Sequence, residues 1–407
     1  MSCCEDQMLT RRALLAGGAV SLAMWGFLPR IASAAGTRDP RLLVVVLRGG
    51  LDGLSLAAPA GDPDYQRLRP GLALTADGSG AGLPLDGFFI LNPNMPFLHG
   101  LYLKKEALVI HAVHSPYRGR SHFDGQDVLE SGLPGTGRIE DGWLNRALAR
   151  LPDSGRVRPN GLAIGATVPL VMRGKAPVLS WIPKVNALPL RDQTLARLLD
   201  LYQHTDPALA AALSEGMTLN SVDPAAAAGA GAKAQPMRVF TEAAQAAAKL
   251  LSSADGPRVG ALSYDGWDTH ANEGVVAGQL ANRLGGLDAA IREFRDGMGA
   301  AWGETAVLVV TEFGRTARVN GTSGTDHGMA TVALLLGGAV RGGHVLADWP
   351  GLADAKLYEG RDVAPTRDLR SIAKGVLRDH LGIPDGALTT GIFPDSAGAR
   401  PQSDLLT

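Results

Sequence analysis

Acidic and imidazole side chains recur just after, or shortly before, short apolar runs of this sequence. They are Asp52, Asp268, His270, Glu312, Asp326 and His327. Carboxylates brought close together repel one another unless a cation or a proton lies between them. Oxygen and imidazole ligands without sulfur suit Zn²⁺, Mn²⁺ or another divalent ion of similar hardness. The pattern therefore predicts a metal or acid–base cluster built from these side chains.

Each of these residues also has a simpler structural interpretation. Asp52 precedes Gly53, and an Asp-Gly pair after a strand is often no more than a turn. In the simpler interpretation of Asp268, its carboxylate accepts the ring N–H of His270 and does no more than orient that imidazole. The metal hypothesis therefore requires that several of the residues meet in space.

A further candidate segment, Arg118 to Asp127, follows the apolar run 108–113 and leads into an expected short helix. Free N–H groups point outward at the start of a helix and bind anions there. Ser121 is a candidate nucleophile activated by a metal, and His122 is a candidate ligand that also fits the helix-start position. Arg120 is a candidate clamp for an anionic substrate. The alternative for Ser121 is a helix N-cap.

Six apolar runs, rich in Val, Leu and Ile, are the expected strands. They are Leu42–Leu47, Leu108–Val113, Pro177–Ile182, Val259–Tyr264, Ala306–Thr311 and Thr331–Leu336. Such continuous apolar strands are buried on both faces, as in a parallel or mixed sheet covered by helices. Helical patterns over Thr241–Leu251, Ala277–Met298 and Pro365–Gly382 alternate with them, which predicts a layered α/β fold. Parallel strands bring residues at their carboxyl ends to one edge, where ligands bind.

The composition excludes several classes of function. Lys and Arg number 39 against 40 Asp and Glu, so the net charge is −1 and nucleic acid is not an expected partner. The only cysteines are Cys3 and Cys4, which excludes thiolate metal sites, catalytic cysteine and structural disulfides from the rest of the chain. The Gly-x-Ser-x-Gly, P-loop and His-Glu-x-x-His signatures are missing as well.

The first residues have the pattern of an export signal. Arg11 and Arg12 precede an apolar stretch, Ala13–Leu28, and the small residues Ala32-Ser33-Ala34 follow it. This pattern is typical of a twin-arginine signal; the alternatives are an ordinary secretory signal or a single N-terminal anchor. We therefore expect the twin-arginine export machinery to be a partner and the destination to be the periplasm or the exterior.

The expected domain organisation follows from that signal. Residues 1–34 are the expected signal peptide, and residues 35–407 form a single domain with insertions and no stable membrane anchor after cleavage. An Ala/Gly-rich stretch at about 223–236 is an expected mobile connection.

Several motifs, together with the twin-arginine start, resemble one protein family. They are Val-Leu-Arg-Gly-Gly-Leu-Asp-Gly-Leu at 46–54, Arg-Ser-His-Phe-Asp-Gly-Gln-Asp at 120–127, Gly-Trp-Asp-Thr-His at 266–270, Thr-Glu-Phe-Gly-Arg-Thr at 311–316, Gly-Thr-Asp-His-Gly at 324–328 and Asp-Trp-Pro-Gly-Leu at 348–352. They resemble the twin-arginine-exported domain-of-unknown-function family 1501, over Arg41 to about Phe393. That family is similar to a branch of the alkaline-phosphatase-like superfamily, which includes sulfatases, phosphodiesterases and cofactor-independent phosphoglycerate mutases.

The resemblance implies a three-layer α/β/α sandwich with a largely parallel central sheet and an alkaline-phosphatase-like topology. It also implies one or two divalent ions, Zn, Mn or Ca, at the strand ends. By this resemblance Asp52 is the first metal-binding Asp, and Asp268 with His270 is an Asp…His pair. Glu312 stands at the strand-end acid position, and His327 matches a later His ligand.

The function implied by the resemblance is an exported, metal-dependent hydrolase of phosphate or sulfate esters. Its substrate would be a small anionic or glycan ester, attacked by a metal-activated nucleophile or by water. Two departures leave alternatives open, because Glu312 stands where Asp is usual and Phe313 where a His ligand is usual. The alternatives are a non-catalytic periplasmic binding protein with a degenerate metal site, and an isomerase or transferase.

Overall fold

The computed structural model describes residues 38–407 except for a set of internal positions. These are 79, 138, 152–158, 166, 183–198, 200–201, 204–209, 212 and 215–235. The chain divides into two units, residues 1–39 and residues 40–407, and the elements below all belong to the second unit. The expected signal peptide and nearly all of the expected Ala/Gly-rich connection lie outside the described residues.

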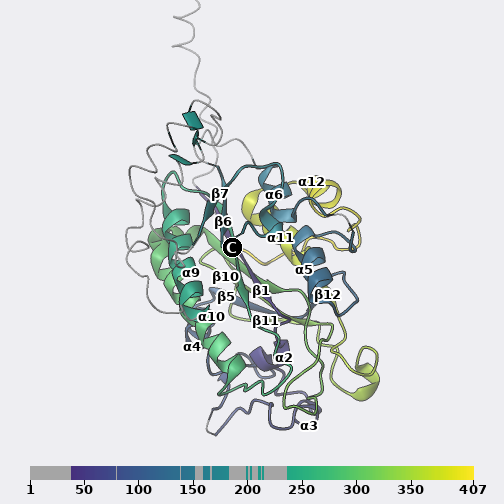
Figure 1. Cartoon of the computed structure of the whole chain (residues 1–407). Coiled ribbons are helices and arrows are strands. Elements are labelled where there is room, and N and C mark those ends of the chain that lie inside the picture. Colours follow the sequence, from purple (N-terminus) through teal and green to yellow (C-terminus); the bar gives the residue numbers. More distant parts are fainter. Residues whose placement is uncertain are drawn as a thin grey trace, which may run out of the picture. The chain divides into compact units, whose positions relative to one another are not determined.

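A nine-stranded sheet lies at the centre of the described part of residues 40–407 (Figure 1). Its strands are β1 (Arg41–Arg48), β5 (Ala107–His114), β6 (Gly161–Ile164), β7 (Val178–Trp181), β8 (Val259–Asp265), β9 (Thr305–Thr311), β10 (Thr331–Leu336), β11 (Val345–Leu346) and β12 (Arg367–Asp368). The order is β11-β5-β10-β9-β1-β8-β6-β7, and β12 pairs with β5. Only β10 runs antiparallel to β1 among these described strands, so the sheet is largely parallel as expected.

All six strands expected from the apolar runs are confirmed, with ends shifted by at most one residue. The strands β6, β11 and β12 were not expected. β11 and β12 are two residues long, too short for an apolar run to stand out from its surroundings. β6 is four residues long and contains Gly161 and Ala163, which weaken its apolar pattern.

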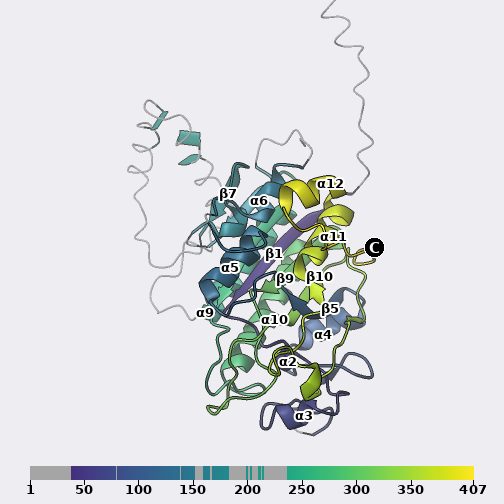
Figure 2. The ribbon, with the colours of Figure 1, turned by 90° about the vertical axis from the view of Figure 1, so that its right-hand side faces the viewer.

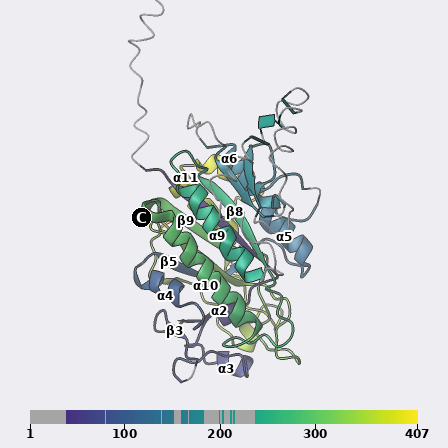
Figure 3. The same ribbon diagram turned by 60° about the vertical axis from the view of Figure 1, so that its left-hand side comes forward.

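Helices cover both faces of the sheet. The described helices are α2 (Gly53–Leu56), α3 (Tyr65–Leu68), α4 (Pro96–Leu103), α5 (His122–Ser131), α6 (Trp143–Leu148), α9 (Pro236–Ser252), α10 (Gln279–Met298), α11 (Leu369–Leu381) and α12 (Asp385–Ala387). α5, α6 and α11 lie on one face (Figure 2), and α4, α9 and α10 lie on the other (Figure 3). A small second sheet has the order β2-β4-β3, built from β2 (Ala57–Ala58), β4 (Ile90–Leu91) and β3 (Leu83–Pro84).

The alternation of side chains along β1 shows why two helical layers are needed. Leu43, Val45 and Leu47 pack into the core beneath α4, α9 and α10. Their neighbours on the opposite side of the strand pack into a separate core beneath α5, α6 and α11. Both sets are almost fully buried, which is the reason the run is apolar without alternation. The predicted α/β/α sandwich is therefore confirmed.

The helix expected over Pro365–Gly382 begins later, at Leu369. Asp368 caps it by accepting a hydrogen bond from the Arg370 N–H, and Gly382 ends it in the left-handed region at φ 71°. Arg367 and Asp368 pair with β5 as the short strand β12 instead. No helix of the described residues has the length and apolar character needed to cross a membrane.

One edge of the sheet collects loops from four strands. The parallel strands β1, β5, β8 and β9 all end there, so the residues that follow them emerge at the same edge. β10 runs the other way, and its amino end lies at this edge too. The loop before β10, which carries Asp326 and His327, therefore meets the loops after β5, β8 and β9.

Candidate metal centre

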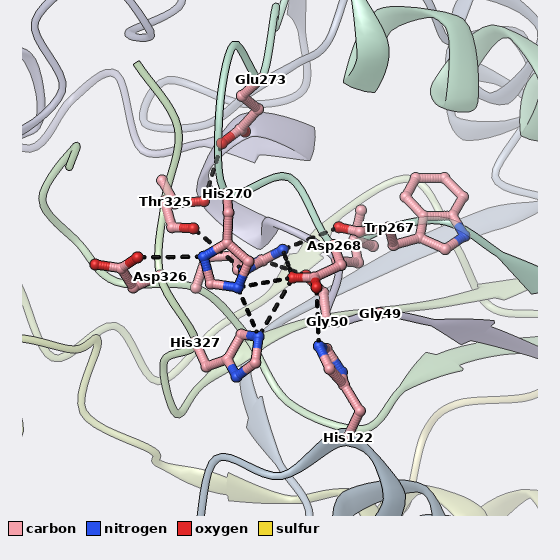
Figure 4. A network of polar contacts seen from close by, with 12 residues as sticks. Gly49, Gly50, His122, Trp267, Asp268, His270, Glu273, Thr325, Asp326 and His327 are labelled. Atoms are coloured by element: carbon pink, nitrogen blue, oxygen red, sulfur yellow. Dashed lines mark hydrogen bonds and ion pairs between the residues drawn. The ribbon is translucent and has the colours of Figure 1, made fainter. Parts of the chain in front are cut away.

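Imidazole and carboxylate groups from three of these loops converge around Asp268 (Figure 4). His270 Nε2 lies 3.1 Å and His327 Nε2 lies 3.3 Å from Asp268 Oδ1. His122 Nε2 lies 3.4 Å from the other oxygen, Oδ2. The ligand atoms of His122, Asp268 and His327 all lie within 4.8 Å of one another, close enough for one ion to bind them together.

The outer nitrogen of each imidazole is held by a hydrogen-bond acceptor. His122 Nδ1 lies 2.8 Å from Glu312 Oε1, and His327 Nδ1 lies 2.7 Å from the carbonyl oxygen of Arg120. His270 Nδ1 lies 3.2 Å from Asp326 Oδ1. Acceptors at Nδ1 assign the proton to that nitrogen, which leaves the Nε2 lone pair of each ring turned inward. In metal sites, a histidine ligand usually donates its other ring N–H to an acceptor of this kind, which fixes the orientation of the ring.

Two observations show that the site fits a cation. The Nε2 atoms of His270 and His327 lie 2.9 Å apart, and two lone pairs so close repel unless a cation or a proton lies between them. The Nε2 atom of His122 is buried and has no hydrogen-bond partner among the described residues. Three imidazole nitrogens and a carboxylate are a donor set that Zn²⁺ accepts readily. His122, Asp268 and His327 are the residues that would hold the ion, and His270, whose Nε2 lies 3.1 Å from Asp268 Oδ1, stands beside them as a further donor.

Glu312 supports the centre from outside the ring of inward-facing atoms. It is fully buried, and Oε1 accepts from the backbone N–H of Gly49 at 2.8 Å and from Gln126 Nε2 at 3.1 Å. Burial raises the pKa of Glu312, but its hydrogen bonds, led by that from His122, hold the pKa below its usual value. In return, the hydrogen bond to Glu312 raises the pKa of His122. Glu312 is therefore placed to orient a ligand rather than to be one.

Arg315 connects Asp268 to the rest of the edge. Its side chain is fully buried; Nη2 donates to Asp268 Oδ1 at 2.6 Å and Nε to the carbonyl of Gly50 at 2.9 Å. Burial raises the pKa of Asp268, but the adjacent guanidinium outweighs it and holds that pKa below its usual value. Asp268 is therefore a carboxylate at neutral pH. By contrast, burial lowers the pKa of His327, which favours the neutral imidazole that a metal requires.

The two glycines after β1 allow the loops to approach closely. Gly49 has φ 123°, and a Cβ there would lie 2.6 Å from the backbone nitrogen of Asp268. Gly50 has φ 69°, and a Cβ there would press on the Phe313 ring at 2.9 Å. Positive φ and this lack of space both require glycine. Gly49 therefore lets the β1 loop pack against the loop that carries Asp268, and Gly50 lets it pack against Phe313 in the loop after β9.

Phe313 packs against the cluster instead of binding a ligand. Its ring centroid lies 4.9 Å from that of His122 and 5.0 Å from that of His327. The ring is almost fully buried and fixes one side of both imidazoles. The residue that stands where the resemblance would place a ligand thus acts as packing in this chain.

The structure brings together most of the residues that the sequence singled out. His122, Asp268 and His327 converge, His270 lies beside Asp268 and His327, and Glu312 and Asp326 hold two of the imidazoles from behind. The other predicted residues, Asp52, Ser121 and Arg120, have different surroundings.

Asp52 is not part of the convergence. It caps α2, accepting from the backbone N–H groups of Leu54 and Ser55, and forms a buried ion pair with Arg69 at 2.5 Å. The physical reason is that the guanidinium reaches the carboxylate from α3 and neutralises it. Arg69 carried no recognisable motif, so the sequence did not indicate this partner.

Ser121 and Arg120 likewise have structural partners. Ser121 Oγ accepts from the backbone N–H of Asp124 and so is the N-cap of α5, the alternative weighed for it. The guanidinium of Arg120 pairs with Glu359 at 2.7 Å and with Asp362 at 3.2 Å. The contribution of Arg120 to the cluster is its backbone carbonyl, which a side-chain motif cannot reveal.

The protein is a layered α/β protein with a His/Asp cluster at one edge of its central sheet. Residues 107–387 match the family described as "Protein of unknown function (DUF1501)". The chain belongs to this family, as its motifs led us to expect. No curated protein matches the chain in sequence.

Solved structures similar to this chain share little sequence with it. A protein in the alkaline phosphatase superfamily from Vibrio parahaemolyticus is 13% identical at a TM-score of 0.35; the match covers 74% of this chain but only 60% of that one. The C-terminal periplasmic domain of EcEptC from Escherichia coli, in complex with Zn, is 11% identical (TM-score 0.34, covering 75% and 74%). Phosphonate monoester hydrolase of Agrobacterium radiobacter is 12% identical (TM-score 0.37, covering 85% and 74%).

Proposed function

We propose that this chain is a metal-dependent hydrolase of phosphate or sulfate esters. The observation that carries the proposal is the inward orientation of three Nε2 atoms around the Asp268 carboxylate, each fixed by an acceptor at Nδ1. Holding polar groups in such an arrangement costs folding free energy, because the buried Nε2 of His122 has no hydrogen-bond partner among the described residues. A divalent ion compensates that cost.

The chain's own residues divide the work of hydrolysis. A divalent ion bound here supplies Lewis acidity toward the ester oxygen and toward an attacking water molecule. Asp268 and the imidazoles would hold that ion, and substrate could reach it, since Asp268 is 41% exposed. Arg361 lies at the rim, donates to the carbonyl of His327 at 3.0 Å and is 35% exposed. Its charge favours an anionic ester over a neutral one.

Water is the attacking group that the geometry favours. Ser121 Oγ already accepts from the backbone of its own helix, and the residue that begins α5 on the side of the cluster is His122. In hydrolysis, the bond from phosphorus or sulfur to the ester oxygen would break as a bond to the water oxygen forms, and a proton from that water would pass to the leaving alcohol. The small anionic or glycan ester remains the proposed substrate class.

The test combines metal analysis with an assay on aryl phosphate and aryl sulfate esters. Purified protein is expected to hold a stoichiometric divalent ion, and His327→Ala is expected to lose both the ion and the activity. His344→Ala is the matched control, because His344 is exposed and precedes β11, which runs parallel to β5, so that it lies on the side of the amino ends of these strands, away from the cluster. Protein without a stoichiometric ion, or full activity after exhaustive chelation, would contradict the proposal.

A non-catalytic binding protein is the second candidate. It is favoured by the helix-capping contact of Ser121, which leaves the site with ligands for an ion but no free nucleophile identified beside them. The same experiment separates the two functions. A stoichiometric ion with no turnover of either ester class, together with retention of sulfated or phosphorylated glycans, supports binding without catalysis.

We also propose that the chain is exported by the twin-arginine pathway. The support is the Arg11-Arg12 pair before the apolar stretch Ala13–Leu28. Replacing both arginines by lysine is expected to retain the chain in the cytoplasm, as fractionation would show. Export of that variant at the normal level would argue for a general secretory signal instead.

A further inference from the structure

A second group of charged side chains lies at the same edge, closed off from solvent. It consists of Asp52, Arg69 and Glu273, each at most 1% exposed. Asp52 follows β1 and, by its position, was predicted to be a metal ligand. Asp52 is the N-cap of α2, Arg69 directly follows α3, and Glu273 lies in the loop after His270.

Four hydrogen bonds fix the guanidinium of Arg69, and every nitrogen of the group donates at least one of them. Nη1 donates to Asp52 Oδ2 at 2.5 Å and to Ser55 Oγ at 3.0 Å. Nη2 donates to the Thr316 carbonyl at 2.7 Å, and Nε to the Ala317 carbonyl at 3.1 Å. The other Asp52 oxygen, Oδ1, accepts from the backbone N–H groups that it caps. The charged guanidinium of Arg69 therefore occupies the position beside Asp52 Oδ2 that a metal ion bound to Asp52 would take.

Glu273 completes the group as a neutral acid. Its Oε2 accepts from Thr325 Oγ1 at 2.9 Å, whereas Oε1 is buried with no hydrogen-bond partner among the described residues. Burial and then the charge of Asp52 raise the pKa of Glu273 to about 8. A proton on Glu273 satisfies its own carboxyl and the neighbouring carboxylate together. With that proton in place, the group has one negative charge and one positive charge.

We infer that the Arg69 guanidinium is the resident cation of this group, so that Asp52 holds no metal and the chain binds a single divalent ion, at the His/Asp cluster. The inference rests on the proposed function for the location of that one ion. A divalent ion beside Asp52 would face a buried guanidinium at contact distance, in surroundings of low dielectric, where like charges repel strongly. It would also have to displace hydrogen bonds that Asp52 already makes.

The arrangement has a consequence for the His/Asp cluster. Arg69 holds the carbonyls of Thr316 and Ala317, and Glu273 holds the side chain of Thr325. These residues stand near the two ends of the segment that leads from Arg315 to His327. Arg69 and Glu273 are therefore positioning residues for His327. They hold together the loops that an ion at Asp52 would otherwise bridge.

The test counts bound ions on the full chain, loaded with Zn²⁺ or Mn²⁺ and dialysed to equilibrium, with elemental analysis as the readout. The unaltered protein is expected to bind one ion per chain. Asp52→Asn, which keeps the shape of the side chain, is expected to bind one ion as well. His327→Ala is expected to bind none. Circular dichroism and the unfolding midpoint establish that each variant is folded.

Two results overturn the inference. One is two ions in the unaltered protein with the loss of one in Asp52→Asn. The other is a single ion that survives His327→Ala and disappears in Asp52→Asn. Failure of the proposed function looks different, since the unaltered protein would then bind no ion at all; that result would refute the count of one along with the function.

Discussion

The His/Asp cluster and the Asp52–Arg69–Glu273 group lie at the same edge of the same sheet, yet their polar groups are satisfied differently. In the Asp52–Arg69–Glu273 group, every side chain is buried and four hydrogen bonds hold the guanidinium, one of them to the Asp52 carboxylate. The atom of this group that has no hydrogen-bond partner among the described residues, Glu273 Oε1, belongs to a carboxyl that a proton neutralises. In the His/Asp cluster, three Nε2 atoms face one carboxylate, and the Nε2 of His122 has no hydrogen-bond partner among the described residues. A closed group with its own cation needs no ligand, whereas a half-open group with unmatched lone pairs does.

The sharpest test of the closed group is removal of its cation. Arg69→Met leaves the buried Asp52 carboxylate without its partner, and we expect a loss of about 3–5 kcal/mol in the free energy of unfolding, measured with urea. Arg69→Lys keeps the charge and is expected to lose less. Arg67→Met is the matched control, since Arg67 is nearly half exposed and pairs only at the surface. Equal effects of Arg69→Met and Arg67→Met would remove the distinction between the two regions.

The corresponding test of the open group is Asp268→Asn. The substitution keeps the shape of the side chain but removes the negative charge on which the imidazoles converge. We expect the affinity for Zn²⁺ to fall by more than about 100-fold, because the loss of a group that binds the metal directly costs more affinity than the loss of a hydrogen-bond partner behind such a group. Competition titration against a chromophoric chelator measures it. Unchanged affinity would show that the ion binds elsewhere.

The pH dependence of stability distinguishes the two groups as well. The pKa of Glu273 is raised to about 8 in the folded chain, so the folded state holds a proton that the unfolded chain releases near its ordinary value. The stabilisation is therefore fully present below the unfolded pKa and is lost as the pH rises through about 8. The expected slope is up to about 1.4 kcal/mol per pH unit between these values.

Glu273→Gln is the variant that isolates this effect. Glutamine stays neutral at every pH. The free energy of unfolding of the variant in urea is therefore expected to vary less than that of the unaltered chain between about pH 5 and about pH 8, which are close to the unfolded and the folded pKa of Glu273. Parallel curves for the two proteins would mean that Glu273 is ionised throughout.

The smallest expected effect concerns the support of His122. Glu312→Gln removes the charge that faces His122 Nδ1 while keeping the size of the side chain. We expect the affinity for the ion to fall by about 10- to 100-fold, as for other partners behind histidine ligands. Gln126→Leu is a useful comparison, because it removes a neutral donor to the same carboxylate. A larger loss in Gln126→Leu than in Glu312→Gln would contradict the role assigned to Glu312.

Much of the framework was predictable from local pattern. The run Leu42–Leu47 is apolar at every position because both faces of β1 are covered, and this pattern alone identified it as a buried strand. The acids and histidines after β8 and β9 were then expected at one edge, as parallel strands require. The late start of α11 was not predictable, because the pairing of Asp368 with β5 involves residues far apart in the chain.

The amino-acid sequence by itself determined the layered fold, the edge and most of the side chains that gather there, because burial and strand direction follow from local patterns of residue type. Only the tertiary structure decided which carboxylates are free to bind an ion. Asp52 and Asp268 both follow buried strands, but Arg69 neutralises one with no room for an ion, whereas Arg315 shares the other with three imidazoles. That choice depends on which guanidinium reaches which carboxylate across the fold, and such long-range pairing leaves no local pattern in the chain.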